Sequence, residues 1–152
     1  MSYYNELKPY IGNQIVKYAR DEIQHQRHFR ISIHDLKAAL MCIEYEMQNV
    51  RGIDQSKERI NTSNNREDIL LNQLEEKENI QKYIDSFTRQ VTRFDKLLDS
   101  LGETERRIIE YELERAVSSP LELSKDLDIQ IDEVKRKEAA ALLKIGNRLL
   151  HL

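Results

Sequence analysis

The chain has 152 residues, enough for one domain or for one small domain with an extension. Charged residues make up 34% of it and hydrophobic residues 39%, with four glycines and two prolines, which favours long helices over many tight turns. No apolar run approaches the ~20 residues that span a membrane, and no secretion signal opens the sequence. No membrane partner is therefore expected. The single cysteine, Cys42, cannot form an internal disulfide, so a reducing cytoplasm is the expected location.

The sequence predicts two helices in residues 1–53, arranged as an N-terminal helical hairpin. The first covers residues 8–26, where apolar side chains recur at helical spacing. The polar, basic residues 24–30 are expected to connect it to a second helix, which Ser32 can cap and which Gly52 ends. The apolar positions of the second helix are Ile33, Leu36, Leu40, Ile43, Met47 and Val50.

Basic side chains and histidines gather around that predicted connection. They are Lys17, Arg20, Arg27 and Arg30, with His25 and His28. This patch is either a second contact with nucleic acid or, as the better-supported interpretation, an ordinary solvated face. The histidines lack cysteine neighbours and H-E-x-x-H spacing, so neither a metal nor a cofactor is expected.

Residues 54–66 contain almost no apolar side chain and are predicted to be a linker. Residues 67–100 are predicted to form one long connecting helix. Its apolar residues step four and three apart in a heptad seam, namely Ile80, Ile84, Phe87, Val91, Phe94, Leu98 and Leu101. Burying each of these large side chains contributes ~1.5–3 kcal/mol. The seam must therefore pack on the second helix, on the same helix of another subunit in a homodimer, or on both.

Residues 101–152 carry the start signal of a short helix. Ser119 can cap the free N–H groups of its first turn, and Pro120 occupies the first helical position, where a missing N–H costs nothing. Glu122 follows three residues after the cap and completes a capping box. The short helix is expected to end near Asp126.

A turn and a longer helix are predicted next. The turn covers residues 127–130, and Asp128 occupies a position that tolerates a left-handed backbone. The longer helix begins near Ile131, with Asp132 and Glu133 at the positive end of its dipole. Its apolar face contains Val134, Ala141, Leu142, Ile145, Leu149 and Leu150. A short helix, a turn and a longer helix with one apolar face form the helix-turn-helix pattern.

The same stretch resembles region four of the bacterial sigma factors. That family carries a small residue, then Leu, Gly, Ile and Ser three to six residues later, and Val ten residues later. This chain has Ser124, Leu127, Asp128, Ile129, Gln130 and Val134 at those spacings, with Asp128 in place of Gly and Gln130 in place of Ser. Residues 101–109 (LGETERRII) are similar to the family's opening. A long helix leading into such a unit is also similar to phage late-gene regulators of the ArpU type.

The resemblance implies an all-α transcription regulator, encoded by a phage or mobile element, that binds double-stranded promoter DNA and has RNA polymerase as a further partner. In such proteins the exposed N-terminal face of the second helix meets base edges and phosphates. The corresponding residues here are Gln130, Asp132, Glu133, Lys135, Arg136 and Lys137, preceded by Ser118 and Ser119. Gln pairs with adenine, Arg with guanine and acidic groups with cytosine, while Lys135 and Lys137 hold phosphates.

The net charge of −3 is low for a DNA-binding protein. Residues 131–152 are locally basic, however, so DNA binding is expected to be modest, steep in its salt dependence, or assisted by a partner. The alternative is a helical adaptor that uses the same fold to bind a protein and no DNA. No phosphate-binding glycine loop, nucleophile motif or catalytic Cys–His pair occurs, so no catalytic residue is expected and the protein is not expected to be an enzyme.

Overall fold

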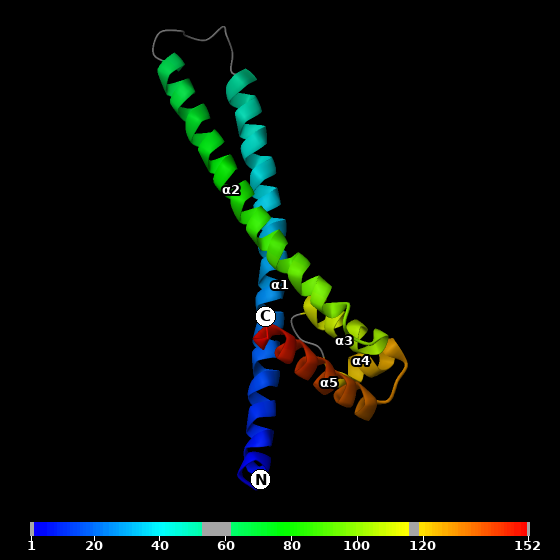
Figure 1. Ribbon diagram of the computed structural model, residues 1–152. Helices are drawn as coiled ribbons and strands as arrows, with labels where there is room; N and C mark the ends of the chain where they lie inside the picture. The colour runs from blue at the N-terminus through cyan, green and yellow to red at the C-terminus, as the bar shows by residue number, and fades with distance from the viewer. Residues whose placement is uncertain (1, 53–61, 116–118, 152) are drawn as a thin grey trace. The chain divides into compact units, whose positions relative to one another are not determined.

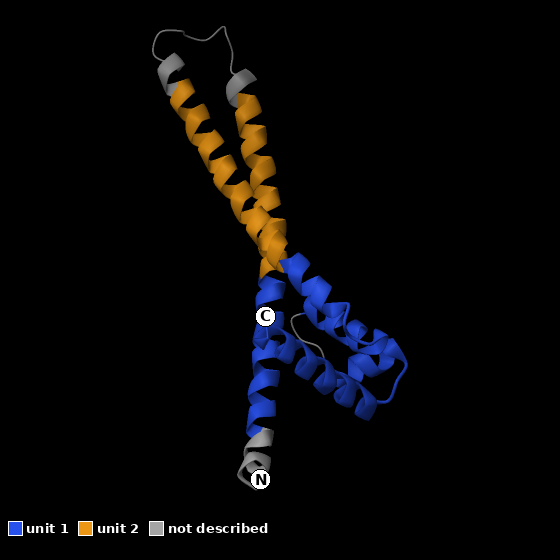
Figure 2. Ribbon diagram, viewed as in Figure 1, with its two compact units in different colours: residues 1–28, 91–152 blue, residues 29–90 orange. Residues whose placement is uncertain are grey.

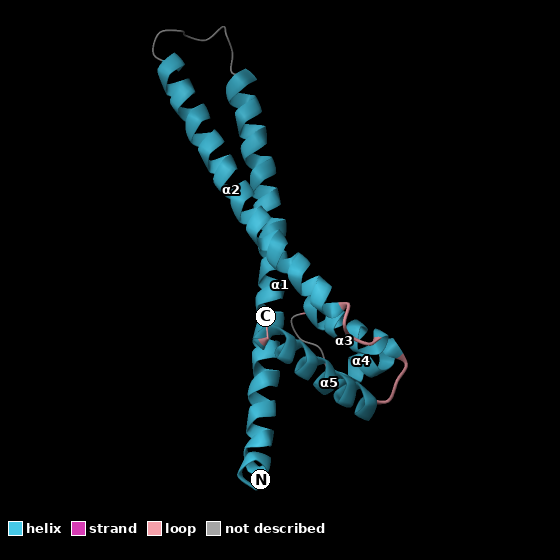
Figure 3. Cartoon of the chain, in the orientation of Figure 1, coloured by secondary structure: helices cyan, strands magenta, loops and turns pink. Residues whose placement is uncertain are grey.

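The structure is a computed structural model that describes residues 2–52, 62–115 and 119–151, with side chains described for residues 10–49, 66–115 and 119–151. It contains the helices α1 (Ser2–Gly52), α2 (Thr62–Leu98), α3 (Glu103–Glu114), α4 (Pro120–Leu127) and α5 (Ile131–Leu150) (Figure 1). The described ranges contain no strand, which confirms the all-α prediction (Figure 3). None of the described helices is apolar over a long enough stretch to cross a bilayer.

The predicted N-terminal hairpin is wrong, because α1 continues through residues 24–30 without a break. That stretch contains neither glycine nor proline, so nothing in it stops a helix. Gln26 is only 2% exposed and follows the buried Ala19 and Ile23 at four- and three-residue steps. Gln26 therefore continues the buried face of one long helix, while Gln24, His25 and His28 beside it are exposed.

The predicted linker of residues 54–66 lies mostly on residues 53–61, outside the described part of the chain. Its last five residues belong to α2, which begins at Thr62. The chain divides into two compact units, residues 29–90 (unit 2) and residues 1–28 with 91–152 (unit 1) (Figure 2).

Unit 2 is a pair of antiparallel helical segments, one from α1 and one from α2 (Figure 2). The rings of Phe29 and Phe87 stack with centroids 5.3 Å apart. Lys77 Nζ lies 3.2 Å from Glu44 Oε1. Within this unit, Ile84 of the predicted seam is buried, and Ile80 and Phe87 are half-buried. This half of the seam therefore packs inside the chain.

Unit 1 has a hydrophobic core that joins α1, the end of α2, α3 and α5. The other half of the predicted seam enters it, with Phe94, Leu98 and Leu101 buried and Val91 half-buried. The remaining buried members are Ala19, Ile23, Leu97, Ile109, Leu113, Ala141, Leu142 and Ile145. The buried residues of the seam therefore serve as core within the chain.

A second hydrophobic cluster connects α3, α4 and α5. Ile108, Leu123 and Val134 are at most 1% exposed. The half-buried Tyr111, Leu127 and Ile129 pack against them. One buried side chain from each helix fixes how the short α4 lies against α5, because close-packed side chains leave little room for either helix to shift.

Candidate nucleic-acid interface

The start of α4 has the predicted serine cap, while the reciprocal bond of the capping box, from the Ser119 N–H to the Glu122 carboxylate, stays a prediction. Ser119 has an extended backbone (φ −100°, ψ 148°), and its Oγ accepts a hydrogen bond from the Glu122 N–H at 3.2 Å. Pro120 is the first helical residue. The Glu122 carboxylate lies 3.4 Å from the Tyr111 hydroxyl and 3.9 Å from Arg115 Nη1. Ser118, predicted as a DNA contact, lies outside the described residues.

The end of α4 is closed by Ser124. Asp128 has the left-handed backbone that its position predicts (φ 55°, ψ 47°), and its N–H donates to the Ser124 carbonyl. The Ile129 N–H donates to the same carbonyl at 3.2 Å. The Ser124 hydroxyl donates in turn to the Ile129 carbonyl. Three hydrogen bonds therefore hold the chain reversal, and a small hydroxyl residue at this position is part of it.

The start of α5 follows at once. Gln130 has an extended backbone (φ −68°, ψ 147°) and its carbonyl accepts from the Val134 N–H at 3.0 Å. The Gln130 side chain makes no capping hydrogen bond. Asp132 and Glu133 lie in the first turn, as predicted, where the helix dipole favours negative charge.

The predicted DNA contacts differ in accessibility. Gln130, Asp132, Lys135 and Arg136 are exposed, whereas Glu133 and Lys137 are half-buried. Arg136 Nη2 lies 3.9 Å from Glu133 Oε1, a loose pair on an open surface. Ser119 is half-buried, and its cap uses an oxygen lone pair, which leaves the hydroxyl proton to donate. The structure thus places four of the predicted side chains on one accessible end of α5.

Sequence reasoning missed Lys125. This exposed lysine lies in the last turn of α4 and lines an open hollow at the chain reversal, together with Ser124, Asp128, Ile129, Gln130 and Glu133. Helical spacing was the available signal, because Leu123 is buried and a residue two positions later lies on the far side of the helix.

A charged cluster joins α1, α3 and α5 on another side of unit 1. Arg20 Nη2 donates to Glu138 Oε1 at 2.9 Å, and Arg27 donates to the Glu112 carbonyl. Burial, together with the neighbouring Glu138, raises the pKa of Glu112 to about 7 against the opposing charges of Arg20 and Arg27. Two members of the predicted basic patch, Arg20 and Arg27, are therefore bound to other helices, while Lys17, Arg20, His25 and His28 are exposed, as the solvated-face interpretation expects.

A second charged pair joins α3 to α5. Lys144 Nζ donates to both carboxylate oxygens of Glu105, at 3.1 and 3.0 Å. Glu105 is 6% exposed, so this lysine neutralises a buried charge. In the first two turns of α5, the exposed cations are Lys135 and Arg136; Arg148 is exposed in its last turn.

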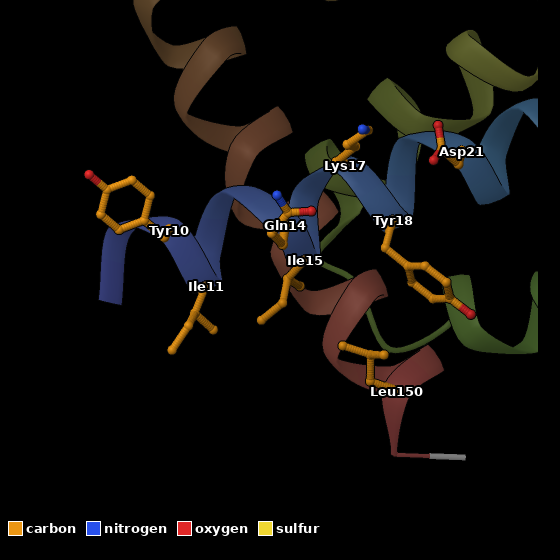
Figure 4. A pocket seen from close by; sticks show the side chains of 8 residues that line it. All are labelled: Tyr10, Ile11, Gln14, Ile15, Lys17, Tyr18, Asp21 and Leu150. Atoms are coloured by element: carbon orange, nitrogen blue, oxygen red, sulfur yellow. The ribbon is translucent and has the colours of Figure 1, made fainter. Parts of the chain in front are cut away.

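A mainly apolar hollow lies at the opposite end of α5 from Gln130 (Figure 4). It is lined by Leu150 of α5 and by seven residues of α1, which are Tyr10, Ile11, Gln14, Ile15, Lys17, Tyr18 and Asp21. Its lining combines one lysine and one aspartate with aromatic and aliphatic groups. These residues do not form an arrangement of nucleophile, base and orienting group.

Comparison of the chain with protein-family models, with curated proteins and with solved structures finds no match. The features of this site are therefore those of its own residues: a chain reversal held by Ser124, and an accessible end of α5 with polar and basic side chains.

Proposed function

We propose that α3, α4 and α5 form a helix-turn-helix unit of the sigma region-four type, and that the protein is a DNA-binding transcription regulator encoded by a phage or mobile element. The observation that carries the proposal is the chain reversal at Asp128. It holds the eight-residue α4 against α5 and leaves the first two turns of α5 accessible. A helix that reads the major groove needs such an accessible N-terminal end on a fixed support.

In this proposal, α5 is the recognition helix. Gln130 and Arg136 have the donors and acceptors to read adenine and guanine edges. Lys135 on α5 and Lys125 on α4 hold phosphates, and Ser119 donates to the DNA backbone. Asp132 selects against the wrong base, because an acidic side chain accepts only from an amino group such as that of cytosine.

The charge balance shapes how such binding would behave. The chain has a net charge of −3, and Asp132 and Glu133 accompany the cations at the start of α5. Non-specific affinity, which depends on phosphate neutralisation, is therefore low. A second protein on the promoter, for which RNA polymerase is the natural candidate, supplies the missing affinity in this proposal.

The same charges favour a second candidate function, a helical adaptor that binds a protein through α4 and α5. Arg136 lies near Glu133 and Lys144 binds Glu105, so part of the basic charge of α5 is already balanced within the chain. The face formed by α4 and α5 therefore has both signs of charge. A protein surface of mixed charge complements such a face better than a polyanion does.

The test is fluorescence anisotropy of a labelled DNA duplex, titrated with protein at 50 and 200 mM salt. The Lys135→Ala/Arg136→Ala variant is compared with Lys82→Ala/Arg89→Ala, which removes two exposed cations from α2. We expect wild type and the α2 variant to bind alike, and the α5 variant to bind at least about tenfold more weakly with a salt slope reduced by about two. Equal binding by the two variants removes α5 from the interface, and salt-insensitive capture of one protein by wild type then favours the adaptor.

A further inference from the structure

One exposed face of α1 in unit 2 has the composition of a buried face. Its residues recur three and four apart, and we call them the outer stripe: Ile31, His34, Ala38, Met41 and Tyr45. Ile31 is 51% exposed, Met41 71% and Tyr45 66%. A helix surface in water normally carries charges at most such positions. Here histidine is the only ionisable side chain along four turns, apart from the phenol of Tyr45.

The outer stripe faces away from α2. Met41 lies two residues before the buried Ile43, and Tyr45 two residues before the buried Met47. Two residues turn an α-helix by about 200°. The buried pair packs within unit 2, so the outer stripe lies on the opposite side of α1, and this part of α1 has two apolar faces.

The two helical segments of unit 2 bury few hydrophobic side chains between them. Among the described residues of unit 2, the buried hydrophobic side chains are Ile43, Met47 and Ile84. An isolated pair of helices gains most of its stability from such burial. A further helix against the outer stripe would remove Ile31, Met41 and Tyr45 from water as well.

We propose that the outer stripe is the interface between two copies of this chain, which pair through α1 in antiparallel orientation. Spacing is compatible with this partner, because the steps of four, three and four from His34 to Tyr45 are the same in both directions. When Ala38 lies opposite Met41 of the second copy, His34 lies opposite its Tyr45. A small residue then faces a large one at the centre of the interface, on both sides of the two-fold axis.

Charge complementarity supports the same pairing. Lys37 and Glu44 are seven residues apart and flank the outer stripe along one edge. In an antiparallel pair of helices these edges meet, which brings Lys37 of one copy beside Glu44 of the other, twice by symmetry. Glu44 also has Lys77 of its own chain at 3.2 Å, so it would lie between two lysines.

The inference is independent of DNA binding, since it concerns only unit 2. Light scattering of the full chain at micromolar concentrations tests it first, with a mass of twice 18.1 kDa expected for wild type. Met41→Glu places a charge in the interface and should weaken dimerisation about 100-fold or more, while the exposed Lys82→Glu should not. Because Met41 is exposed in the single chain, circular dichroism should show unchanged helix content. A monomeric wild type, or equal masses for both variants, overturns the proposal.

A charge exchange tests the pairing of Lys37 with Glu44. One protein carries Lys37→Glu, and the other carries Glu44→Lys with Lys77→Glu, which keeps its internal ion pair. Each alone places like charges together and should dimerise about tenfold more weakly than wild type. Mixed in equal amounts, the two proteins should form a heterodimer of wild-type strength. If mixing the two proteins does not restore the dimer affinity of wild type, Lys37 and Glu44 do not face each other.

Cysteine cross-linking tests the antiparallel orientation in a Cys42→Ser background. Oxidation of a mixture of Ala38→Cys and Met41→Cys proteins should give a disulfide-linked heterodimer, because these positions are opposed. Ile31→Cys should give none, since the two copies of this residue would lie about 25 Å apart along the helices. Efficient linkage through residue 31 would show a parallel pair and contradict the proposed interface.

Discussion

Gly146 of α5 lies against the backbone of Ile15 of α1, so closely that a Cβ on the glycine would come within 2.6 Å of the Ile15 carbonyl oxygen. Carbon and oxygen atoms do not approach that closely without strain. Gly146 is buried beside Ile145, at the edge of the unit 1 core. The absence of a side chain at this position is therefore what lets α5 and α1 cross in contact.

Gly146→Ala should destabilise unit 1 by about 1–3 kcal/mol, because the added methyl group forces the two helices apart. Within an ordinary helix the same substitution is stabilising by about 1 kcal/mol, so the sign is diagnostic. Gly12→Ala in α1 is the matched control, since nothing lies within 4 Å of its Cβ position. Urea denaturation of wild type and both variants measures the change in the free energy of unfolding. A Gly146→Ala protein as stable as Gly12→Ala would contradict the close crossing.

Local signals in the sequence predicted the ends of α4 and the start of α5. A capping serine before a proline, and a residue tolerant of a left-handed backbone, act within a few positions of themselves. The heptad seam likewise predicted which side of α2 is buried. Each of these features depends on neighbours in the chain, which is why the residues alone were sufficient.

Contacts between distant residues were not predictable in this way. Arg20 binds Glu138, 118 positions away, and neither residue carries a local sign of the other. Gln26 misled the prediction for a related reason: a polar residue at a buried position looks like a loop residue in the sequence. Its burial becomes apparent only when other helices lie against α1.

Gln26 offers a test of that explanation. Its Nε2 donates to Glu22 Oε1 at 3.0 Å, but no described residue donates to its buried Oε1. Gln26→Leu keeps nearly the same volume and removes an unsatisfied polar atom, so it should stabilise the protein by about 1 kcal/mol and raise Tm by about 2–4 °C. Gln24→Leu, at an exposed position, should change Tm little. A fall in Tm for Gln26→Leu alone would mean that its oxygen has a partner that matters.

Asp128 has the only positive φ among the described non-glycine residues. Glycine adopts this backbone without the steric cost that a Cβ imposes, so Asp128→Gly should stabilise the protein by about 0.5–1 kcal/mol. Asp128→Val should destabilise it by at least about 1 kcal/mol, because a β-branched residue tolerates this conformation least. Chemical denaturation measures the free energy of unfolding of the glycine and valine variants. If valine is accepted as readily as glycine, the chain reversal does not have the left-handed form.

Glu112 should make stability depend on pH near neutrality. In the folded protein, burial and the adjacent Glu138 raise the pKa of Glu112 from 4.5 to about 7, against Arg20 and Arg27. The folded state therefore binds a proton more tightly than the unfolded chain does. This contribution is complete below about pH 4.5 and is lost as the pH rises through 7, which lowers the free energy of unfolding by about 3 kcal/mol.

Glu112→Gln preserves the shape of the side chain and a hydrogen-bond donor toward Glu138, but it cannot ionise. It should match wild type at pH 4 and exceed its stability at pH 8, so that the fall across this interval disappears. Urea denaturation at several pH values measures this, with Glu114→Gln as a control at an exposed position of the same helix. Parallel pH profiles for wild type and Glu112→Gln would show that Glu112 is already ionised in the folded protein, with Arg20 and Arg27 outweighing its burial.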